Sequence, residues 1–132
     1  IEATGEFTVS FPGPQQILDA SLAAAMRDPD GSKPSLAALE TFPADHVAGV
    51  LVRDSYLWLE CTRERVIDGF GDNSLIVGRI VAAAVDERAL RASDSDDADL
   101  IGGLPLLAYL SPGRFAPVAQ SYSFPYPADY RL

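Results

Sequence analysis

The sequence has 132 residues, a formal net charge of −9 and one cysteine. Nucleic acids and anionic membranes bind positive protein surfaces, so this charge argues against both as partners. A single cysteine excludes an internal disulfide and most thiolate metal sites, and we expect no metal centre and a cytoplasmic location. The composition, 48% hydrophobic, predicts one globular domain over residues 1–132, and no apolar run reaches the ~18–20 residues of a membrane span.

The first half of the chain predicts short elements. Alternating apolar residues predict a half-buried strand over Glu6–Phe11, and apolar residues at helical spacing predict a helix over Gln15–Met26. Serine is a good N-cap, so a short helix is expected over Ser35–Glu40. Thr41–Asp45 is then expected to be a loop, and Val47–Val52 a short apolar strand.

Two long strands joined by a turn are predicted next. They cover Tyr56–Ile67 and Ser74–Asp86, with the turn at Asp68–Asn73. An alanine-rich helix could also be written through Ile76–Leu90, but β-branched residues and the preceding turn residues favour a strand as far as Val85. Because this strand is apolar on both faces, we expect a barrel wall covered outside by a helix or by another subunit.

The remaining segments are weaker in pattern. We expect a loop over Ser93–Asp99, strand or loop segments at Pro105–Leu110 and Arg114–Ser121, and an aromatic, proline-bearing tail over Tyr122–Leu132. The predicted fold class is therefore mainly β with short helices.

Familiar catalytic constellations are mostly absent from the sequence. The single histidine, His46, is expected at the surface or as a cap. The acidic run Asp94–Asp99 lacks the glycine and glutamate of a calcium loop, so a solvated loop is favoured. Gly69–Ser74 approximates the start of a dinucleotide fingerprint, but it joins two strands, and a hairpin turn is favoured. Cys61 is expected to be a small buried hydrophobe and Trp58 a core or interface residue.

Several short motifs occur in the order and spacing typical of one family. They are Thr4–Ser10, Leu59-Glu60-Cys61, Gly71-Asp72-Asn73, Val77-Gly78, Val85-Asp86, Pro105–Leu110 and Gly113–Phe115. On these residues the chain resembles the flavin reductase-like family, whose members are FMN-binding split β-barrel proteins. The resemblance runs from Ile1 to about Phe124.

The resemblance implies an antiparallel split β-barrel that is incomplete in this chain. Ile1 aligns after the family's phosphate-binding loop, so the family's N-terminal strands are expected to be missing. Either the chain is a fragment, or a separate N-terminal chain pairs with it, or the phosphate site has been lost.

The resemblance also implies a function. A member of this family would bind FMN, or FAD, at a homodimer interface and pass a hydride from NAD(P)H to the flavin, which could serve a partner monooxygenase. The implied cofactor-binding residues are Asp72, Asn73, Arg114 and Phe115, with Asn73 also the catalytic residue. The family usually has a histidine at this bend, and asparagine does not titrate near neutral pH.

Two alternatives stay open at this point. The first is a non-catalytic split-barrel scaffold or binding protein, favoured by the absent phosphate-binding segment and by Asn73. The second is a flavin-dependent enzyme that acts directly on an organic substrate, for which Asn73 would change specificity.

Overall fold

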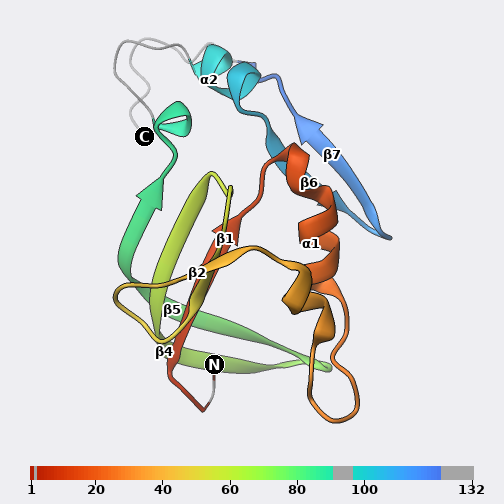
Figure 1. Cartoon of the computed structure of the whole chain (residues 1–132), viewed down its shortest axis with the longest axis vertical. Coiled ribbons are helices and arrows are strands. Elements are labelled where there is room, and N and C mark those ends of the chain that lie inside the picture. The colour runs from red at the N-terminus through yellow and green to blue at the C-terminus, as the bar shows by residue number, and fades with distance from the viewer. Residues whose placement is uncertain (2, 91–96, 123–132) are drawn as a thin grey trace.

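The computed structural model, which describes residues 1, 3–90 and 97–122, is built around a three-stranded antiparallel sheet (Figure 1). The strands, in the order β1-β4-β5, are β1 (Glu6–Phe11), β4 (Leu57–Phe70) and β5 (Asn73–Val85). Cys61 of β4 lies opposite Phe7 of β1 and Ile80 of β5. The predicted N-terminal strand and the predicted long hairpin are therefore confirmed. The turn is shorter than the predicted Asp68–Asn73, because β4 continues to Phe70 and β5 begins at Asn73.

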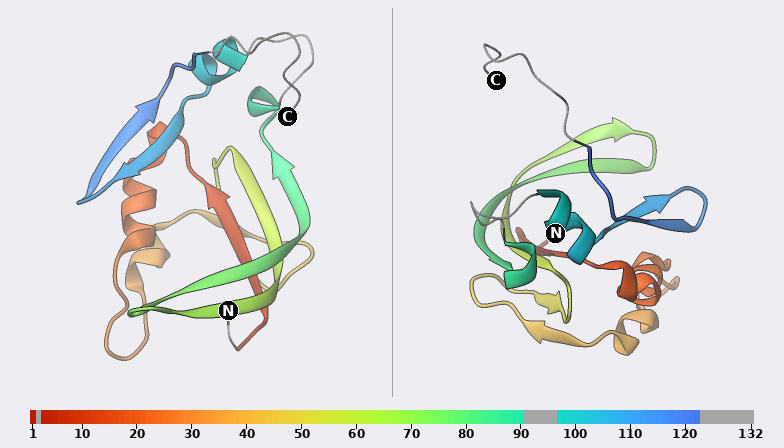
Figure 2. Two further views of the ribbon diagram at one scale, coloured as in Figure 1. Left: turned by 180° about the vertical axis from the view of Figure 1, so that it is seen from behind. Right: turned by 90° about the horizontal axis from the view of Figure 1, so that it is seen from above.

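The β4–β5 hairpin bends strongly along its length (Figures 1 and 2). Its register shifts between Glu60 and Cys61 and again between Arg63 and Arg65. Such irregularities bend a strand and increase its twist. The strand β4 pairs with β1 as far as Thr62, and beyond it pairs with β5 alone. The hairpin thus has a base within the sheet and a two-stranded arm.

The elements between β1 and β4 differ in detail from the predictions. They are the 3-10 helix η1 (Pro14–Gln16), α1 (Ile17–Ala24), the 3-10 helix η2 (Pro34–Ala38), β2 (Thr41–Pro43) and β3 (Val50–Val52). The predicted helix ends two residues early because Ala25 has left the helical conformation, with ψ at 145°, and Met26 is 90% exposed. The loop predicted at Thr41–Asp45 is wrong in its first three residues, because these pair with β3.

The C-terminal elements are two short helices followed by a two-stranded ribbon that is separate from the main sheet. They are the 3-10 helix η3 (Glu87–Ala89), α2 (Asp97–Gly103), β6 (Leu106–Leu110) and β7 (Arg114–Val118), and β6 pairs antiparallel with β7. The predicted loop Ser93–Asp99 is wrong from Asp97, where α2 begins, and residues 93–96 lie outside the described residues. The predicted aromatic tail also lies outside them, except for the exposed Tyr122.

The hydrophobic core of the described chain is small. Its buried apolar residues are Leu39, Val47, Leu51 and Cys61. The cysteine is therefore the buried hydrophobe that we expected. Several large side chains of β5 stay exposed, namely Leu75, Ile80, Val81 and Val85. The cover expected for this two-faced apolar strand is not supplied by the described residues.

The described residues form three sheets that do not close into a barrel. The predicted fold class, mainly β with short helices, is confirmed. None of the described helices is long and apolar enough to cross a membrane.

Candidate functional site

The predicted pair Asp72 and Asn73 lies at the tip of the β4–β5 arm. Gly71 and Asp72 make the turn, and Gly71 has a positive φ of 67°. Positive φ at the first turn residue is typical of a two-residue hairpin turn. Ser74 Oγ donates a hydrogen bond of 2.6 Å to Asp68 Oδ1 across the turn. The structure thus places both predicted residues side by side and exposed to solvent.

The other predicted pair, Arg114 and Phe115, begins β7. The ring of Phe115 stacks edge-on against Tyr109 of β6, with ring centroids 5.4 Å apart. Phe115 lines an open pocket of about 410 Å³ between α1 and the β6–β7 ribbon. The other lining residues are apolar or aromatic: Pro12, Ala20, Ala24, Leu107 and Tyr109. We call this the Phe115 pocket.

The two predicted pairs lie on different hairpins. Both hairpin ends point to the side of the molecule that carries α1 (Figures 1 and 2). Asp72, Asn73 and Arg114 line neither the Phe115 pocket nor the pocket described next. Of the four predicted cofactor-binding residues, the structure therefore brings only Phe115 into a pocket, and the joint site remains a prediction.

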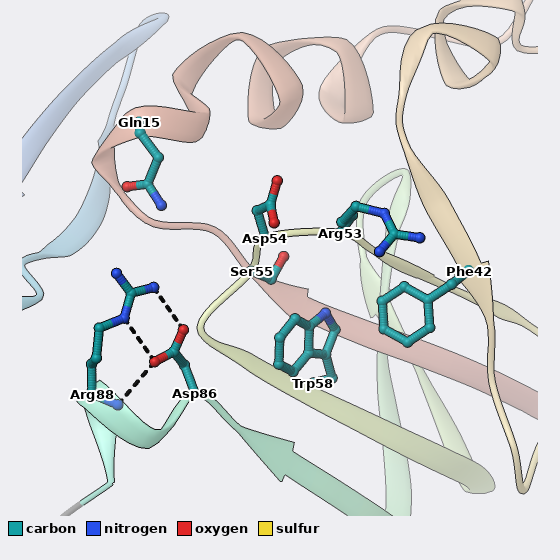
Figure 3. Close-up of a pocket in the computed structure, with 8 residues that line it drawn as sticks. All are labelled: Gln15, Phe42, Arg53, Asp54, Ser55, Trp58, Asp86 and Arg88. Carbon is teal, nitrogen blue, oxygen red and sulfur yellow. Dashed lines mark hydrogen bonds and ion pairs between the residues drawn. The ribbon is translucent and has the colours of Figure 1, made fainter.

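A second pocket, of about 480 Å³, lies at the base of the hairpin (Figure 3). Trp58 of β4 and Phe42 of β2 form its aromatic wall, with ring centroids 6.0 Å apart. Trp58 Nε1 donates a hydrogen bond of 2.7 Å to the carbonyl oxygen of Val52, which fixes the indole. The guanidinium of Arg53 lies 5.7 Å from the centroid of the Phe42 ring. We call this the Trp58 pocket.

An ion pair lines one end of the Trp58 pocket. Arg88 Nε and Nη2 donate hydrogen bonds of 2.9 and 2.7 Å to the two carboxylate oxygens of Asp86 (Figure 3). The Arg88 backbone N–H also donates to Asp86 Oδ1, at 2.9 Å. These hydrogen bonds from the side chain and backbone of Arg88 lower the pKa of Asp86 to about 2. The pair is therefore charged at any physiological pH.

Two residues of the β3–β4 connection complete the Trp58 pocket. Ser55 is 1% exposed, and its Oγ has no hydrogen-bond partner within the part of the chain that the structure describes. Asp54 has a φ of 60°, a left-handed conformation that is uncommon outside glycine. Sequence reasoning missed this pocket because its residues come from segments far apart in the chain and form no motif.

A buried carboxylate, also missed, anchors the segment before β3. Glu60 is 7% exposed and accepts hydrogen bonds from the backbone N–H groups of Asp45, His46 and Val47, at 3.3, 2.6 and 3.2 Å. Burial raises the pKa of Glu60, but the backbone donors of His46 and Asp45 and the His46 ring outweigh it, and the pKa lies below its ordinary value. His46 is exposed, as expected, with Nδ1 3.6 Å from Glu60 Oε1.

Comparisons with known proteins identify the family of the chain. Residues 1–116 match the family described as the flavin reductase like domain. The chain belongs to this family. No curated protein sequence matches it.

Three solved structures illustrate which proteins share this fold. The 2-nitrobenzoate 2-nitroreductase of Pseudomonas fluorescens has a TM-score of 0.75 and 16% identity over 100% of this chain and 64% of its own. Component B of nitrilotriacetate monooxygenase from Bacillus cereus has a TM-score of 0.71 and 23% identity, over 93% of this chain and 61% of its own. The flavoredoxin of Desulfovibrio vulgaris has a TM-score of 0.72 and 20% identity, over 98% of this chain and 68% of its own.

These likenesses establish the fold of the family member. Together with the family match, they confirm the predicted flavin reductase-like split-barrel fold. The chain spans less than two thirds of the length of the first two structures.

Proposed function

We propose that the protein is a flavin-dependent oxidoreductase that binds FMN and accepts a hydride from NAD(P)H. The observation that carries this proposal is the family match over residues 1–116, together with a fold shared with flavoredoxin and with a nitroreductase. A flavin supplies the electron-transfer chemistry when bound, and the protein supplies binding, orientation and electrostatics. FAD is the alternative flavin, since an NADH:FAD oxidoreductase is among the proteins of similar fold.

The residues of this chain fit a flavin in chemical character. An isoalloxazine ring has an apolar end, which suits the aromatic lining that Phe115 and Tyr109 give the Phe115 pocket. Arg114, next to Phe115, is a permanent cation with several donors, suited to a phosphate or to ring oxygens. Asp72 and Asn73 offer exposed acceptors and an amide donor at the arm's tip.

Asn73 would act by orientation rather than by proton transfer. Its amide donates and accepts hydrogen bonds but does not titrate near neutral pH. Its place in the bend supports a role in positioning the flavin or the substrate. We therefore expect an Asn73 variant to change the catalytic rate but to leave the shape of its pH profile unchanged.

One observation favours a second candidate function. Since the family's usual histidine is Asn73 here, the protein could act directly on an organic substrate, as its nitroreductase relative's description suggests for that protein. A passive flavin-binding scaffold is the corresponding non-catalytic alternative. A monooxygenase partner is supported by the fold shared with component B of nitrilotriacetate monooxygenase.

We also propose that the protein forms a homodimer. The support is the edge strand β5, whose large apolar side chains Leu75, Ile80 and Val81 are about half exposed. Exposed apolar surface of this kind is typical of interfaces. Light scattering on the purified chain should give twice the chain mass, and a monomer at all concentrations would contradict the proposal.

The flavin proposal is tested by spectroscopy on the purified chain. We expect added FMN to bind and its visible absorbance to bleach when NADH or NADPH is added without oxygen. Asn73→Ala should weaken FMN binding or slow bleaching by about tenfold, the loss expected for one good hydrogen bond to a charged or polar ring system. Glu64→Gln, on the same arm but away from the tip, serves as the control.

The outcomes separate the candidates. A chain that binds neither FMN nor FAD would overturn the flavin proposal. A chain that binds FMN without bleaching by either nicotinamide would favour the scaffold. If NAD(P)H bleaches the bound flavin, and a nitroaromatic or enone added without oxygen is reduced and restores the flavin absorbance, direct action on an organic substrate is favoured.

A further inference from the structure

We propose that the Trp58 pocket is a second small-molecule site, which binds a planar aromatic carboxylate and is separate from the residues assigned to the flavin. Its volume of about 480 Å³ lies within the ~300–1,000 Å³ usual for small-molecule sites. None of Asp72, Asn73, Arg114 and Phe115 lines it. The inference therefore stands independently of the proposed flavin chemistry.

The aromatic wall accounts for a flat, apolar ligand. Trp58 is held by its hydrogen bond to Val52 and by edge-on contact with Phe42, and Phe42 in turn carries the guanidinium of Arg53. These contacts hold the wall in one conformation before a ligand arrives. Aromatic pairs favour stacked or edge-on contact with a further ring. Preorganisation of this kind lowers the entropic cost of binding.

The opposite end of the pocket offers hydrogen-bond donors. Arg88 uses Nε and Nη2 to bind Asp86, and the outer nitrogen of its guanidinium points toward the amide of Gln15 (Figure 3). Arginine has five N–H groups, so donors remain beyond those that Asp86 binds. Because the charges of Asp86 and Arg88 balance each other, a ligand carboxylate meets the remaining N–H donors of Arg88 without a net negative charge beside them. Charge-assisted hydrogen bonds to a carboxylate are the strongest that such donors make.

The buried Ser55 hydroxyl is an independent sign of a ligand site. Ser55 lines the pocket and is 1% exposed, and its Oγ has no partner among the described residues. A buried unpaired hydroxyl costs free energy, so it calls for a partner, which a ligand in this pocket would supply. The neighbouring Asp54 is held in a left-handed conformation, which is enriched at ligand sites.

Asp54 sets the orientation of the ligand. Its exposed carboxylate lies on the Arg53 side of the pocket, away from the Asp86–Arg88 pair (Figure 3). The Arg53 guanidinium at this end is paired with Glu40, with Nε 3.7 Å from Oε2, so two carboxylates stand against one cation. At the other end the Asp86 carboxylate is balanced by Arg88. A ligand carboxylate is therefore repelled at the Asp54 end and favoured at Arg88. The ring of the ligand therefore lies toward Asp54 and Trp58, and its carboxylate toward Arg88 and Gln15.

The chain carries a built-in reporter for the test. Trp58 is the only tryptophan, so its fluorescence reports on this pocket alone. We would titrate the purified full chain with benzoate, with neutral benzamide and with cationic benzylamine. We expect a saturable fluorescence change with benzoate, a weaker affinity for benzamide and the weakest for benzylamine.

Three variants test the electrostatic argument. Arg88→Gln should weaken benzoate binding by about tenfold or more, since a charge-assisted hydrogen bond is lost. Asp54→Asn should strengthen it a few-fold, because asparagine tolerates the left-handed conformation and removes the like charge. Arg79→Gln is the matched control, because Arg79 is also an exposed arginine paired with a carboxylate, that of Glu64, but lies on β5 outside the pocket. Circular dichroism checks that each variant is folded.

Each other result would overturn the proposal. A linear, non-saturable response to all three probes would show that no site exists. Equal weakening by Arg79→Gln and Arg88→Gln would reduce the effect to net charge. If FMN gives the same Trp58 response and displaces benzoate, the pocket belongs to the flavin and is no second site, while the flavin proposal itself survives.

Discussion

The base and the arm of the β4–β5 hairpin are parts of the same two strands, yet they are stabilised differently. In the base, β4 lies between β1 and β5, Cys61 is 3% exposed, and Glu60 ties in the segment before β3. In the arm, β4 pairs with β5 alone, and the side chains at the tip are exposed. We therefore expect the base to stabilise the fold and the exposed tip of the arm to be available for binding a ligand.

Because of this difference, we expect substitutions in the base and in the arm to change different properties of the protein. Residues of the base are held by several neighbours, so replacing them is expected to change the free energy of unfolding. Residues at the tip have few neighbours, so replacing them is expected to change binding or local opening. Stability is not uniform across a protein, and regions with few buried contacts open first.

The largest effect is expected at Glu60 in the base. Glu60→Gln replaces one carboxylate oxygen by an NH₂ group that faces one or two of the three backbone donors, and it removes the charge that they stabilise. We expect the melting temperature to fall by about 5–10 °C. Glu64→Gln, an exposed residue of the same strand, should change it by no more than about 1 °C. Equal shifts in the two variants would mean that Glu60 does not anchor the base.

A second effect is expected where the base meets the arm. A Cβ at Gly78 would overlap the ring of Phe7, with Cε1 at 2.7 Å, and would lie 3.3 Å from the backbone oxygen of Thr62. Overpacking of this kind costs about 1–3 kcal/mol, so Gly78→Ala should unfold at lower urea concentration than the wild type. Gly102→Ala, which meets no atom closer than 3.9 Å, is the control. An unchanged urea midpoint for Gly78→Ala would show that Phe7 moves aside freely.

A smaller and local effect is expected at the tip. Gly71→Ala puts a Cβ on a residue with φ of 67°, which costs about 1–2 kcal/mol. Hydrogen exchange should quicken for amides of the arm, such as Val77, and stay unchanged for amides of the base, such as Leu59. Gly71→Asn should restore slow exchange, since asparagine tolerates this conformation. Faster exchange at Leu59 as well would show that base and arm open together.

The smallest effect is expected from the Asp86–Arg88 pair at the end of the base. The pKa of Asp86, about 2, lies below its ordinary value of 3.8. The pair therefore stabilises the fold above pH ~4, and this contribution is lost as the pH falls through about 2. The difference in melting temperature between wild type and Asp86→Asn should be small, because Arg88 is exposed, and should vanish near pH 2. A difference that persists at pH 2 would contradict this account.

Much of the fold could be predicted from local patterns. The alternation in Glu6–Phe11 and the β-branched runs around the Gly71 turn specify strands because their period and turn chemistry have few other solutions. The order of motifs around Leu59-Glu60-Cys61 was enough to predict the family that the match over residues 1–116 establishes. The candidate site residues Asp72 and Asn73 could be placed at a turn for the same reason.

Only the tertiary structure decided which of these residues meet. The extent of α1, the pairing of Thr41–Pro43 with β3 and the start of α2 depend on neighbours distant in sequence. The burial of Glu60 and the Trp58 pocket depend on β2, the β3–β4 connection and the end of β5 coming together. The sequence by itself determined β1, the β4–β5 hairpin and the family, since these rest on local periodicity and motif order. The contacts of its charged side chains rest on long-range packing, which no local pattern encodes.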